Sequence, residues 1–145
     1  MANFITIIFK ESEIANSVLC FAGGGILHNF AYHEPRSVEE ACELLQNYGT
    51  EAKVLAGGTD LIVKFRSGSL QPQHVVNIKK IPGLRDIVYQ ADGLHIGAAA
   101  TMNEAEKAVA GIPAYRVLAE ALHCVASYQL RNLATVAGNL CNASP

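Results

Sequence analysis

The chain has 145 residues, of which 50% are hydrophobic and 17% are charged, and its formal net charge is −2. This length fits one domain or two small subdomains, and the apolar content is too high for a mostly disordered chain. The charge balance gives no basic surface for nucleic acid, and no apolar run reaches the ~18–20 residues of a membrane-spanning helix. We therefore expect a soluble globular protein with no nucleic-acid or membrane partner.

Residues 1–29 contain two apolar patches, at 4–9 and 18–22, with charged residues between them at 10–13. A secretory signal would begin with basic residues and continue as one unbroken apolar stretch. We therefore interpret residues 1–29 as an N-terminal extension of uncertain structure and expect a cytoplasmic protein.

Residues 30–80 predict a first subdomain that begins with a helix. Ser37 and Glu40 have the spacing of a capping box, and apolar residues recur at helical spacing as far as Gly49. This pattern predicts a helix over residues 38–48.

A strand, a glycine turn, a short helix and another strand complete this predicted subdomain. The apolar run at 53–56 predicts a buried strand, and Thr59 or Asp60 is placed to cap a helix over 61–67. The β-branched residues at 74–78 predict the next strand.

Residues 81–145 predict the beginning of a second subdomain, which is incomplete. Asp92 and Gly93 predict a hairpin between strands at 85–90 and 94–98. Helices are expected next, from the capping box at Thr101 to about residue 110 and over 114–125, and residues 130–145 have the composition of a turn-rich tail. Together these elements indicate an α+β fold.

Two glycine-containing turns are the candidates for a binding site. The first is Ala56–Asp60, between a strand and a helix, where glycines let the backbone approach a ligand and a helix N-terminus presents amides to an anion such as pyrophosphate. The same pattern also describes a tight turn with no ligand. Neither a P-loop nor a GxGxxG motif after a strand is present.

The second turn is Thr135–Asn139, whose Thr and Asn side chains offer hydrogen-bond donors. Nearby, Arg131 has two interpretations, because it could meet a phosphate or pair with an acidic residue. Asp60 in the first turn could likewise accept a hydrogen bond from a ligand hydroxyl or cap its helix. The two turns indicate a common site only if they converge in space.

The cysteines and histidines form no recognisable ligand set. They are Cys20, Cys42, Cys124 and Cys141, and His28, His33, His74, His95 and His123. Their spacings match no zinc motif and no nucleophile–base pair. We therefore expect free thiols in a reducing compartment, no metal site, and no catalytic acid, base or nucleophile.

Two segments resemble the FAD-binding motifs of the flavoprotein subunit of molybdenum hydroxylases. That family includes the medium subunit of carbon monoxide dehydrogenase and the FAD subunit of xanthine dehydrogenase. Residues 54–61 (VLAGGTDL) resemble the first motif, residues 131–145 (RNLATVAGNLCNASP) resemble the second, and residues 30–35 resemble the usual start of the subunit. The likeness keeps the family's order and spacing over residues 30–145.

The resemblance implies an α+β, two-subdomain FAD-binding domain of the molybdopterin dehydrogenase (PCMH) type, with FAD between the subdomains. It implies that the FAD contacts are Val54, Leu55, Ala56, Gly57, Gly58, Thr59, Asp60, Leu61, Ala126, Thr135, Val136, Ala137, Gly138 and Asn139. It also implies that electrons pass from a molybdopterin-binding large subunit, through 2Fe–2S clusters on a small subunit and then FAD, to NAD or another acceptor.

Two departures from the family limit what this resemblance implies. Residues 1–29 match nothing in it, and the chain ends at Pro145 before the acidic residue and further sheet that follow the second motif in the family. We therefore expect the N-terminal portion of such a subunit, truncated at the C-terminus. The alternative is a fragment with no FAD binding or activity of its own.

Overall fold

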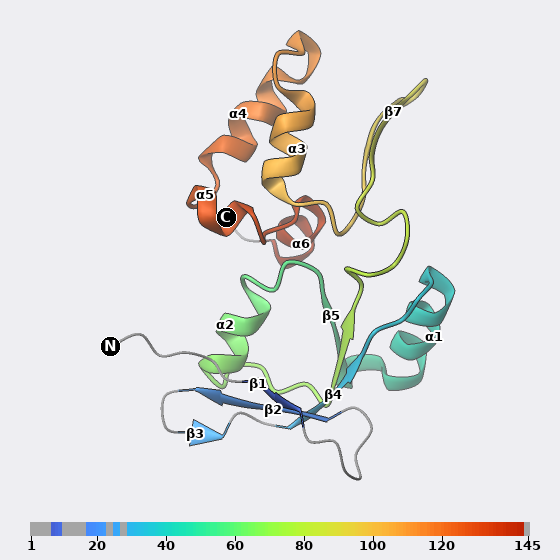
Figure 1. Ribbon diagram of the computed structural model, residues 1–145, viewed down its shortest axis with the longest axis vertical. Coiled ribbons are helices and arrows are strands. Elements are labelled where there is room, and N and C mark those ends of the chain that lie inside the picture. The colour runs from blue at the N-terminus through green and yellow to red at the C-terminus, as the bar shows by residue number, and fades with distance from the viewer. Residues whose placement is uncertain (1–6, 10–16, 23–24, 27–28, 144–145) are drawn as a thin grey trace. The chain divides into compact units, whose positions relative to one another are not determined.

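The computed structural model describes residues 7–9, 17–22, 25–26 and 29–143 (Figure 1). The chain forms two compact units. The first unit contains the chain up to Leu55 together with residues 60–81, and the second contains residues 56–59 together with the chain from Pro82 onward. The predicted subdomain ranges of 30–80 and 81–145 do not include this exchange of residues 56–59, and they stay a prediction.

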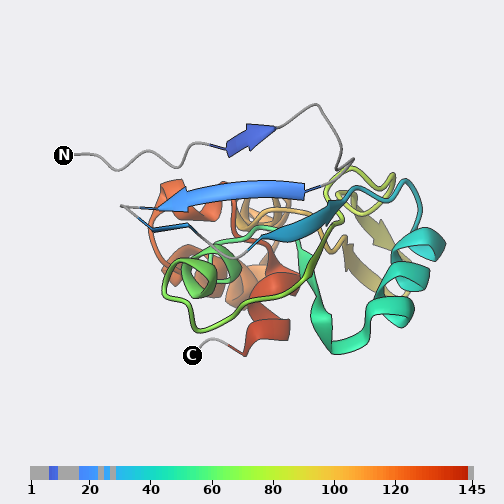
Figure 2. The ribbon, with the colours of Figure 1, turned by 90° about the horizontal axis from the view of Figure 1, so that it is seen from below.

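The first unit is built on a sheet whose parallel strands are β4 (Phe30–His33), β6 (His74–Asn77) and β5 (Ala52–Leu55), in that order. Helix α1 (Val38–Tyr48) leads from β4 to β5, and α2 (Leu61–Arg66) leads back from β5 to β6. The chain thus moves two strands across the sheet and one back. Because crossovers between parallel strands are right-handed, the two helices must lie on opposite faces, as Figures 1 and 2 show.

The N-terminal extension adds antiparallel strands to this sheet. They are β1 (Ile7–Phe9), β2 (Ser17–Ala22) and β3 (Gly25–Ile26), and β2 pairs with β1, β3 and β4. In the β2–β4 pairing, Ser17 lies opposite Ala31. The other residues of the 1–29 extension lie outside the described residues.

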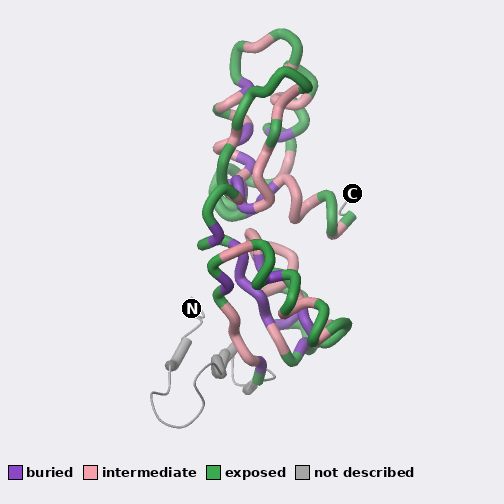
Figure 3. The backbone as a smooth tube through the Cα atoms, turned by 90° about the vertical axis from the view of Figure 1, so that its right-hand side faces the viewer, coloured by how far each residue is buried: buried purple, intermediate pink, exposed green. Residues whose placement is uncertain are grey.

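Apolar side chains form the core of the first unit. Its buried side chains that pack together are those of Phe30, Leu55, Phe65 and Val75. The ring centroids of Phe30 and Phe65 lie 5.7 Å apart. Figure 3 shows that the buried residues of this unit lie mainly in its strands. Each such side chain contributes about 1.5–3 kcal/mol when it is fully buried.

The predicted helix at 38–48 is confirmed as α1, but half of its capping box is different. The Ser37 hydroxyl accepts a hydrogen bond from the Glu40 amide at 3.1 Å, as expected. The Glu40 carboxylate accepts from the Arg36 amide at 2.7 Å instead of from that of Ser37. The short helix η1 (Gly49–Glu51) then leads into β5.

The strand predicted at 53–56 is β5, and its description as a buried strand is partly wrong. Ala52 and Leu55 are buried, but Val54 is 42% exposed. The reason is topological: among the described strands β5 lies at the edge of the sheet, with β6 as its single neighbour, so part of the strand faces solvent. An apolar run in the sequence does not distinguish an edge strand from a central one.

The second unit begins with the hairpin β7 (Ile87–Gln90) and β8 (Gly93–Ile96). Helix α3 (Met102–Val109) follows, and both hydrogen bonds of the capping box predicted at Thr101 are present. The predicted hairpin and helix are therefore confirmed, although β7 begins two residues later than expected and β8 begins one residue earlier and ends two residues earlier.

Four further elements complete the unit: η2 (Pro113–Tyr115), α4 (Arg116–Cys124), α5 (Tyr128–Arg131) and α6 (Val136–Asn142). The expectation of a turn-rich tail over 130–145 is therefore wrong. Valine, glycine and asparagine have low helix propensity, but the side chains of Ser127 and Thr135 cap α5 and α6 and set where they begin.

The core of the second unit lies between α3, α4 and the start of α6. Its buried side chains are Met102, Ala105, Leu122 and Ala134. No helix in the described part of the chain combines the length and the apolar character that crossing a membrane requires.

Candidate functional site

The first motif meets the segment just before α6 through backbone atoms, within the second unit. A Cβ placed on Gly57 would overlap the carbonyl oxygen of Leu133 and would lie 3.0 Å from Cα of Ala134. Only glycine allows this approach of the two backbones. The two turns that the sequence singled out are therefore brought together.

The first motif also leaves several backbone donors unused. None of the hydrogen bonds within the described residues involves the N–H groups of Gly57, Gly58 or Thr59. Gly58 has φ +81°, the left-handed region that glycine adopts without steric cost. As far as the described residues go, three consecutive N–H groups are thus free to donate to an anion.

The second motif is the first turn of α6 and not a turn in a loop, which corrects the sequence interpretation. The Thr135 hydroxyl accepts a hydrogen bond from the Gly138 amide at 3.0 Å. A Cβ on Gly138 would lie 2.7 Å from that hydroxyl, so glycine keeps the cap intact. The amides of Val136 and Ala137 have no acceptor in the described residues, as is usual in a first helical turn. Ser144 and Pro145, the end of this motif, lie outside the described residues.

Helix α3 fixes where the second motif begins. The Met102 amide donates to the Ala134 carbonyl at 2.8 Å, and Thr101 forms an isolated antiparallel bridge with Thr135. Ala134 and Thr135 are both buried. The start of α6 is therefore paired with the start of α3, although the two helices are more than 25 residues apart in sequence.

Glu104 in turn holds Thr101. One carboxylate oxygen accepts from the Thr101 amide at 2.9 Å and from its hydroxyl at 2.8 Å. The other accepts from Nε of Arg85 at 2.8 Å. The hydrogen bond from Arg85, followed by those from Thr101, lowers the pKa of Glu104 to about 2. The carboxylate is therefore ionised wherever the protein functions near neutral pH.

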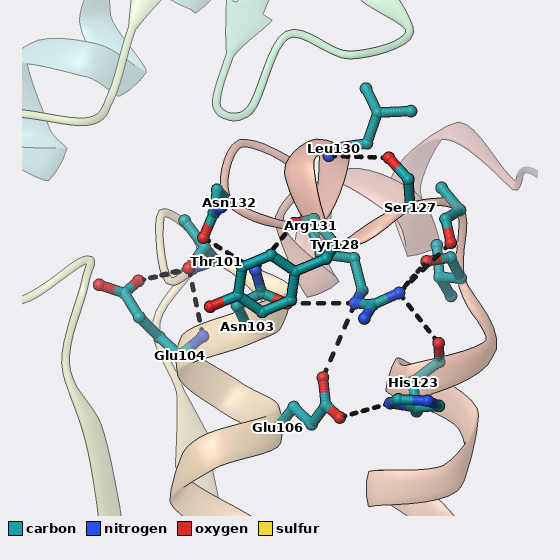
Figure 4. Close-up of polar contacts among 12 residues, drawn as sticks. Thr101, Asn103, Glu104, Glu106, His123, Ser127, Tyr128, Leu130, Arg131 and Asn132 are labelled. Carbon is teal, nitrogen blue, oxygen red and sulfur yellow. Dashed lines mark hydrogen bonds and ion pairs between the residues drawn. The ribbon is translucent and has the colours of Figure 1, made fainter.

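Arg131 is buried and reaches back to the end of α4, as Figure 4 shows. Its guanidinium donates to the carbonyl oxygens of His123, Val125 and Ala126 and to Oδ1 of Asn103, and it lies 3.7 Å from a carboxylate oxygen of Glu106. Of the two interpretations from sequence, the one with an acidic partner agrees with the structure. Phosphate binding by this side chain does not, because its donors point into the protein.

Ala126, the weaker of the expected FAD contacts, has an unusual backbone. Its φ is +46°, in the left-handed region, which costs a non-glycine residue about 1–3 kcal/mol. Ser127 follows as the cap of α5, accepting from the Leu130 amide at 3.3 Å. The role of Ala126 as an FAD contact stays a prediction.

The remaining expected contacts, Val54, Leu55, Asp60 and Leu61, belong to the first unit. Leu55 and Leu61 pack in its apolar core. Asp60 precedes α2, but its side chain makes no capping hydrogen bond. The structure therefore gives no support to the interpretation of Asp60 as a helix cap. These four residues stay predictions.

Sequence reasoning did not identify Leu133, Ala134, Thr101 or Glu104 as parts of the site. The capping box at Thr101 was visible in the sequence, but its pairing with Thr135 was not. A backbone contact such as that of Gly57 with Leu133 leaves no signal in one sequence beyond the glycine itself.

Comparison with known proteins identifies the family. Residues 28–145 match the family described as the FAD binding domain in molybdopterin dehydrogenase. The carbon monoxide dehydrogenase medium chain of Hydrogenophaga pseudoflava is 36% identical over 80% of this chain, and the nicotinate dehydrogenase FAD-subunit of Eubacterium barkeri is 34% identical over 81%. In both cases the match covers 40% of the relative, so the chain spans about two fifths of the length of these relatives.

Solved structures agree with this result. A Cu,Mo-CO dehydrogenase chain matches 80% of this chain and 41% of its own length, with 31% identity and a TM-score of 0.73. Quinoline 2-oxidoreductase from Pseudomonas putida 86 matches 79% and 40%, with 26% identity and a TM-score of 0.71. The expected α+β fold and the expected cofactor, FAD, are both supported by these findings. The chain belongs to the family of FAD-binding domains of molybdopterin dehydrogenases.

Proposed function

We propose that this chain is the N-terminal portion of the FAD-binding subunit of a molybdenum-containing hydroxylase or dehydrogenase. In this role it passes electrons from iron–sulfur clusters through FAD to NAD or another acceptor. The observation that carries the proposal is the backbone contact of Gly57 with Leu133 and Ala134, which brings the two expected FAD motifs together in one unit.

The residues at this contact fit the diphosphate of FAD. The parts of the two motifs in the second unit, residues 56–59 and 133–139, contain no acidic side chain. They offer N–H groups with no acceptor among the described residues, at Gly57–Thr59 and in the first turn of α6. Backbone N–H groups in a glycine-containing loop are suitable donors for phosphate oxygens.

The protein's own contribution is binding and orientation, while FAD, when bound, accepts electrons and passes them on. We propose that the amides of Gly57, Gly58 and Thr59 hold the phosphates and that the first turn of α6 binds next to them. Thr135 keeps that turn in place through its cap to Gly138.

The proposed partners are a molybdopterin-binding large subunit and a 2Fe–2S small subunit. Relatives of this chain are subunits of dehydrogenases for carbon monoxide and for nicotinate, two dissimilar compounds. This variety supports the proposal that substrate is selected on another subunit. We propose a cytoplasmic location, in agreement with the free thiols of Cys42, Cys124 and Cys141.

A titration with FAD tests the binding proposal. Purified chain is added to FAD, and binding is followed by the change in flavin absorbance and fluorescence, with ADP as a competitor. We expect saturable binding of FAD. Because ADP lacks the flavin half of FAD, we expect it to bind more weakly and to displace FAD only when it is in large excess. If FAD does not bind, the alternative holds, namely a fragment that cannot bind FAD on its own, and if ADP competes as well as FAD, the chain is a general nucleotide binder.

A further inference from the structure

Arg131 is, in the described part of the chain, the one charged residue that is buried, with 5% of its surface exposed. Removing a guanidinium from water is costly unless charged or polar groups replace the water. Five groups do so here: three main-chain carbonyls, one amide oxygen and, at longer range, one carboxylate. The arrangement is drawn in Figure 4.

The three carbonyls lie at and just beyond the end of α4, where no helical N–H group can reach them. Nη1 of Arg131 donates to the carbonyls of His123 and Val125 at 2.9 Å and to that of Ala126 at 3.3 Å. The carbonyls of Val125 and Ala126 belong to the two peptide groups on either side of the Ala126 Cα. A single nitrogen therefore holds both peptide planes that define the left-handed conformation of Ala126.

The turn of α5 that contains Arg131 also holds the chain that enters α6. The carbonyl of Leu130, the residue before Arg131, accepts from the amides of Leu133 and Ala134 at 2.9 and 2.8 Å. These two residues are the ones that meet Gly57. The segment on which the first motif rests is therefore a direct continuation of the turn that Arg131 holds.

Asn103 connects this turn to α3. Its Oδ1 accepts from Nε of Arg131 at 3.1 Å, while its Nδ2 donates to the Tyr128 carbonyl at 2.9 Å and to Oδ1 of Asn132 at 2.8 Å. One hydrogen-bond network around the buried Arg131 thus fixes Ala126, the turn of α5 and the approach to the second motif.

We propose that Arg131 is a positioning residue for FAD binding. It acts through Ala126 and through Leu133–Ala134, and it does not touch FAD itself. This inference rests on the proposed function, because it assigns a task to Arg131 within that same site.

The first test is Arg131→Lys, which keeps the charge but replaces the planar fork with a point charge that cannot reach the same set of acceptors. The control is Arg116→Lys, on exposed α4 surface where Arg116 pairs with Glu120. We expect Arg131→Lys to weaken FAD binding about tenfold or more, the scale of a lost charge-assisted hydrogen bond. The control should remain within about twofold, since exposed ion pairs contribute little. Equal effects from the two variants would overturn the proposal.

A double-mutant cycle with Ala126→Gly distinguishes positioning from general stability. Glycine adopts the left-handed conformation without help, so in this background we expect Arg131→Lys to weaken FAD binding only about threefold, a coupling within the usual range for contacting residues. An effect that is the same in both backgrounds would show that Arg131 does not act through Ala126.

Amide hydrogen exchange on the chain without FAD provides a readout that does not depend on FAD. In Arg131→Lys we expect faster exchange at Leu133 and Ala134 but unchanged exchange at Gly97 and Ala99, which are bonded elsewhere in the same unit. Equal acceleration at all four would indicate a loss of global stability and would overturn the proposal. A wild-type chain that does not bind FAD would refute the proposed function, while the exchange result would still decide whether Arg131 positions these segments.

Discussion

The two units stabilise their backbones by different means. The first unit relies on a sheet and an apolar core of Phe30, Leu55, Phe65 and Val75. The second also has an apolar core, of Met102, Ala105, Leu122 and Ala134. In addition, the side chains of Thr101, Asn103, Glu104 and Arg131 form hydrogen bonds with main-chain atoms of its turns and helix ends. The segments that meet at Gly57 all belong to this second unit.

The difference indicates what each kind of interaction provides. Apolar burial is not directional and depends mainly on the area removed from water. Hydrogen bonds to chosen carbonyls and amides fix the orientation of particular peptide groups. A ligand held by backbone N–H groups needs that second kind of precision, and we expect mutations in the two units to differ accordingly.

The largest loss of stability is expected from Phe65→Ala. Removal of this buried ring should lower the free energy of unfolding by about 3–5 kcal/mol, because of lost transfer free energy and the cavity left behind. Val63→Ala on the same helix is the control, since Val63 is 61% exposed. Urea denaturation of both variants measures the difference, and similar midpoints would contradict the assignment of the core.

Gly57→Ala should cost about 1–3 kcal/mol, the usual range for overpacking, because its Cβ meets the Leu133 backbone. FAD binding should be lost in the same variant, and Gly57→Val should lower stability further.

The control is Gly111→Ala, where φ is +78° but nothing lies within 4 Å of the added Cβ. That variant tests backbone conformation alone, so it should lower stability and leave FAD affinity unchanged. Retained FAD affinity in Gly57→Ala would refute our placement of the contact.

Glu104→Gln should lower stability at pH 7 by about 1 kcal/mol, the scale of a lost helix cap. In the wild-type protein, the stability contributed by Glu104 should also depend on pH in the acid range. Because the pKa of Glu104 is lowered from 4.5 to about 2, its contribution is present above pH 4.5 and is lost as the pH falls from there toward 2. In Glu104→Gln, the pH dependence of the urea midpoint should flatten over that range. An unchanged slope would mean that another carboxylate causes it.

The smallest effect is expected from a histidine pair in the first unit. His33 Nε2 lies 3.0 Å from His74 Nδ1. The Tyr48 ring stacks on the His74 ring, with 3.5 Å between the ring centroids. Burial, and secondly the charge of His74, lower the pKa of His33 from 6.5. The neutral form therefore stabilises the fold above pH 6.5, and this stability is lost as the pH falls through the lowered value. His33→Asn should remove that dependence between pH 7.5 and 5.5, while His95→Asn, on the exposed hairpin, should not.

Local patterns in the sequence predicted the elements of the fold well. The capping residues Ser37 and Thr101 and the Asp92-Gly93 hairpin correctly indicated α1, α3 and the β7–β8 pair. The helices α5 and α6 were missed because their propensities are poor and their caps act in context. The family and the cofactor, which were inferred from the two motifs, are confirmed by the family match and by the FAD-subunit relatives.

The contacts between distant segments were not predictable from one sequence. Nothing in the sequence shows that Gly57 lies against Leu133, or that Thr101 pairs with Thr135. The fate of Arg131 was open between phosphate and acid, because an arginine near a glycine-containing motif suits both. Three-dimensional pairing decided it, since main-chain carbonyls at the end of α4 accept hydrogen bonds from its guanidinium.

The central claim is that the N–H groups of the two motifs that lack an acceptor in the described residues form one binding site for the FAD phosphates in the second unit. The most direct measurement is the amide NMR spectrum of the chain during an FAD titration. We predict that the amide signals of Gly57, Gly58, Thr59, Val136 and Ala137 shift together with one Kd, while those of Val75 and Val76 in β6 do not. If FAD binds and the signals of the first five residues do not move, the phosphates lie elsewhere and the account is wrong.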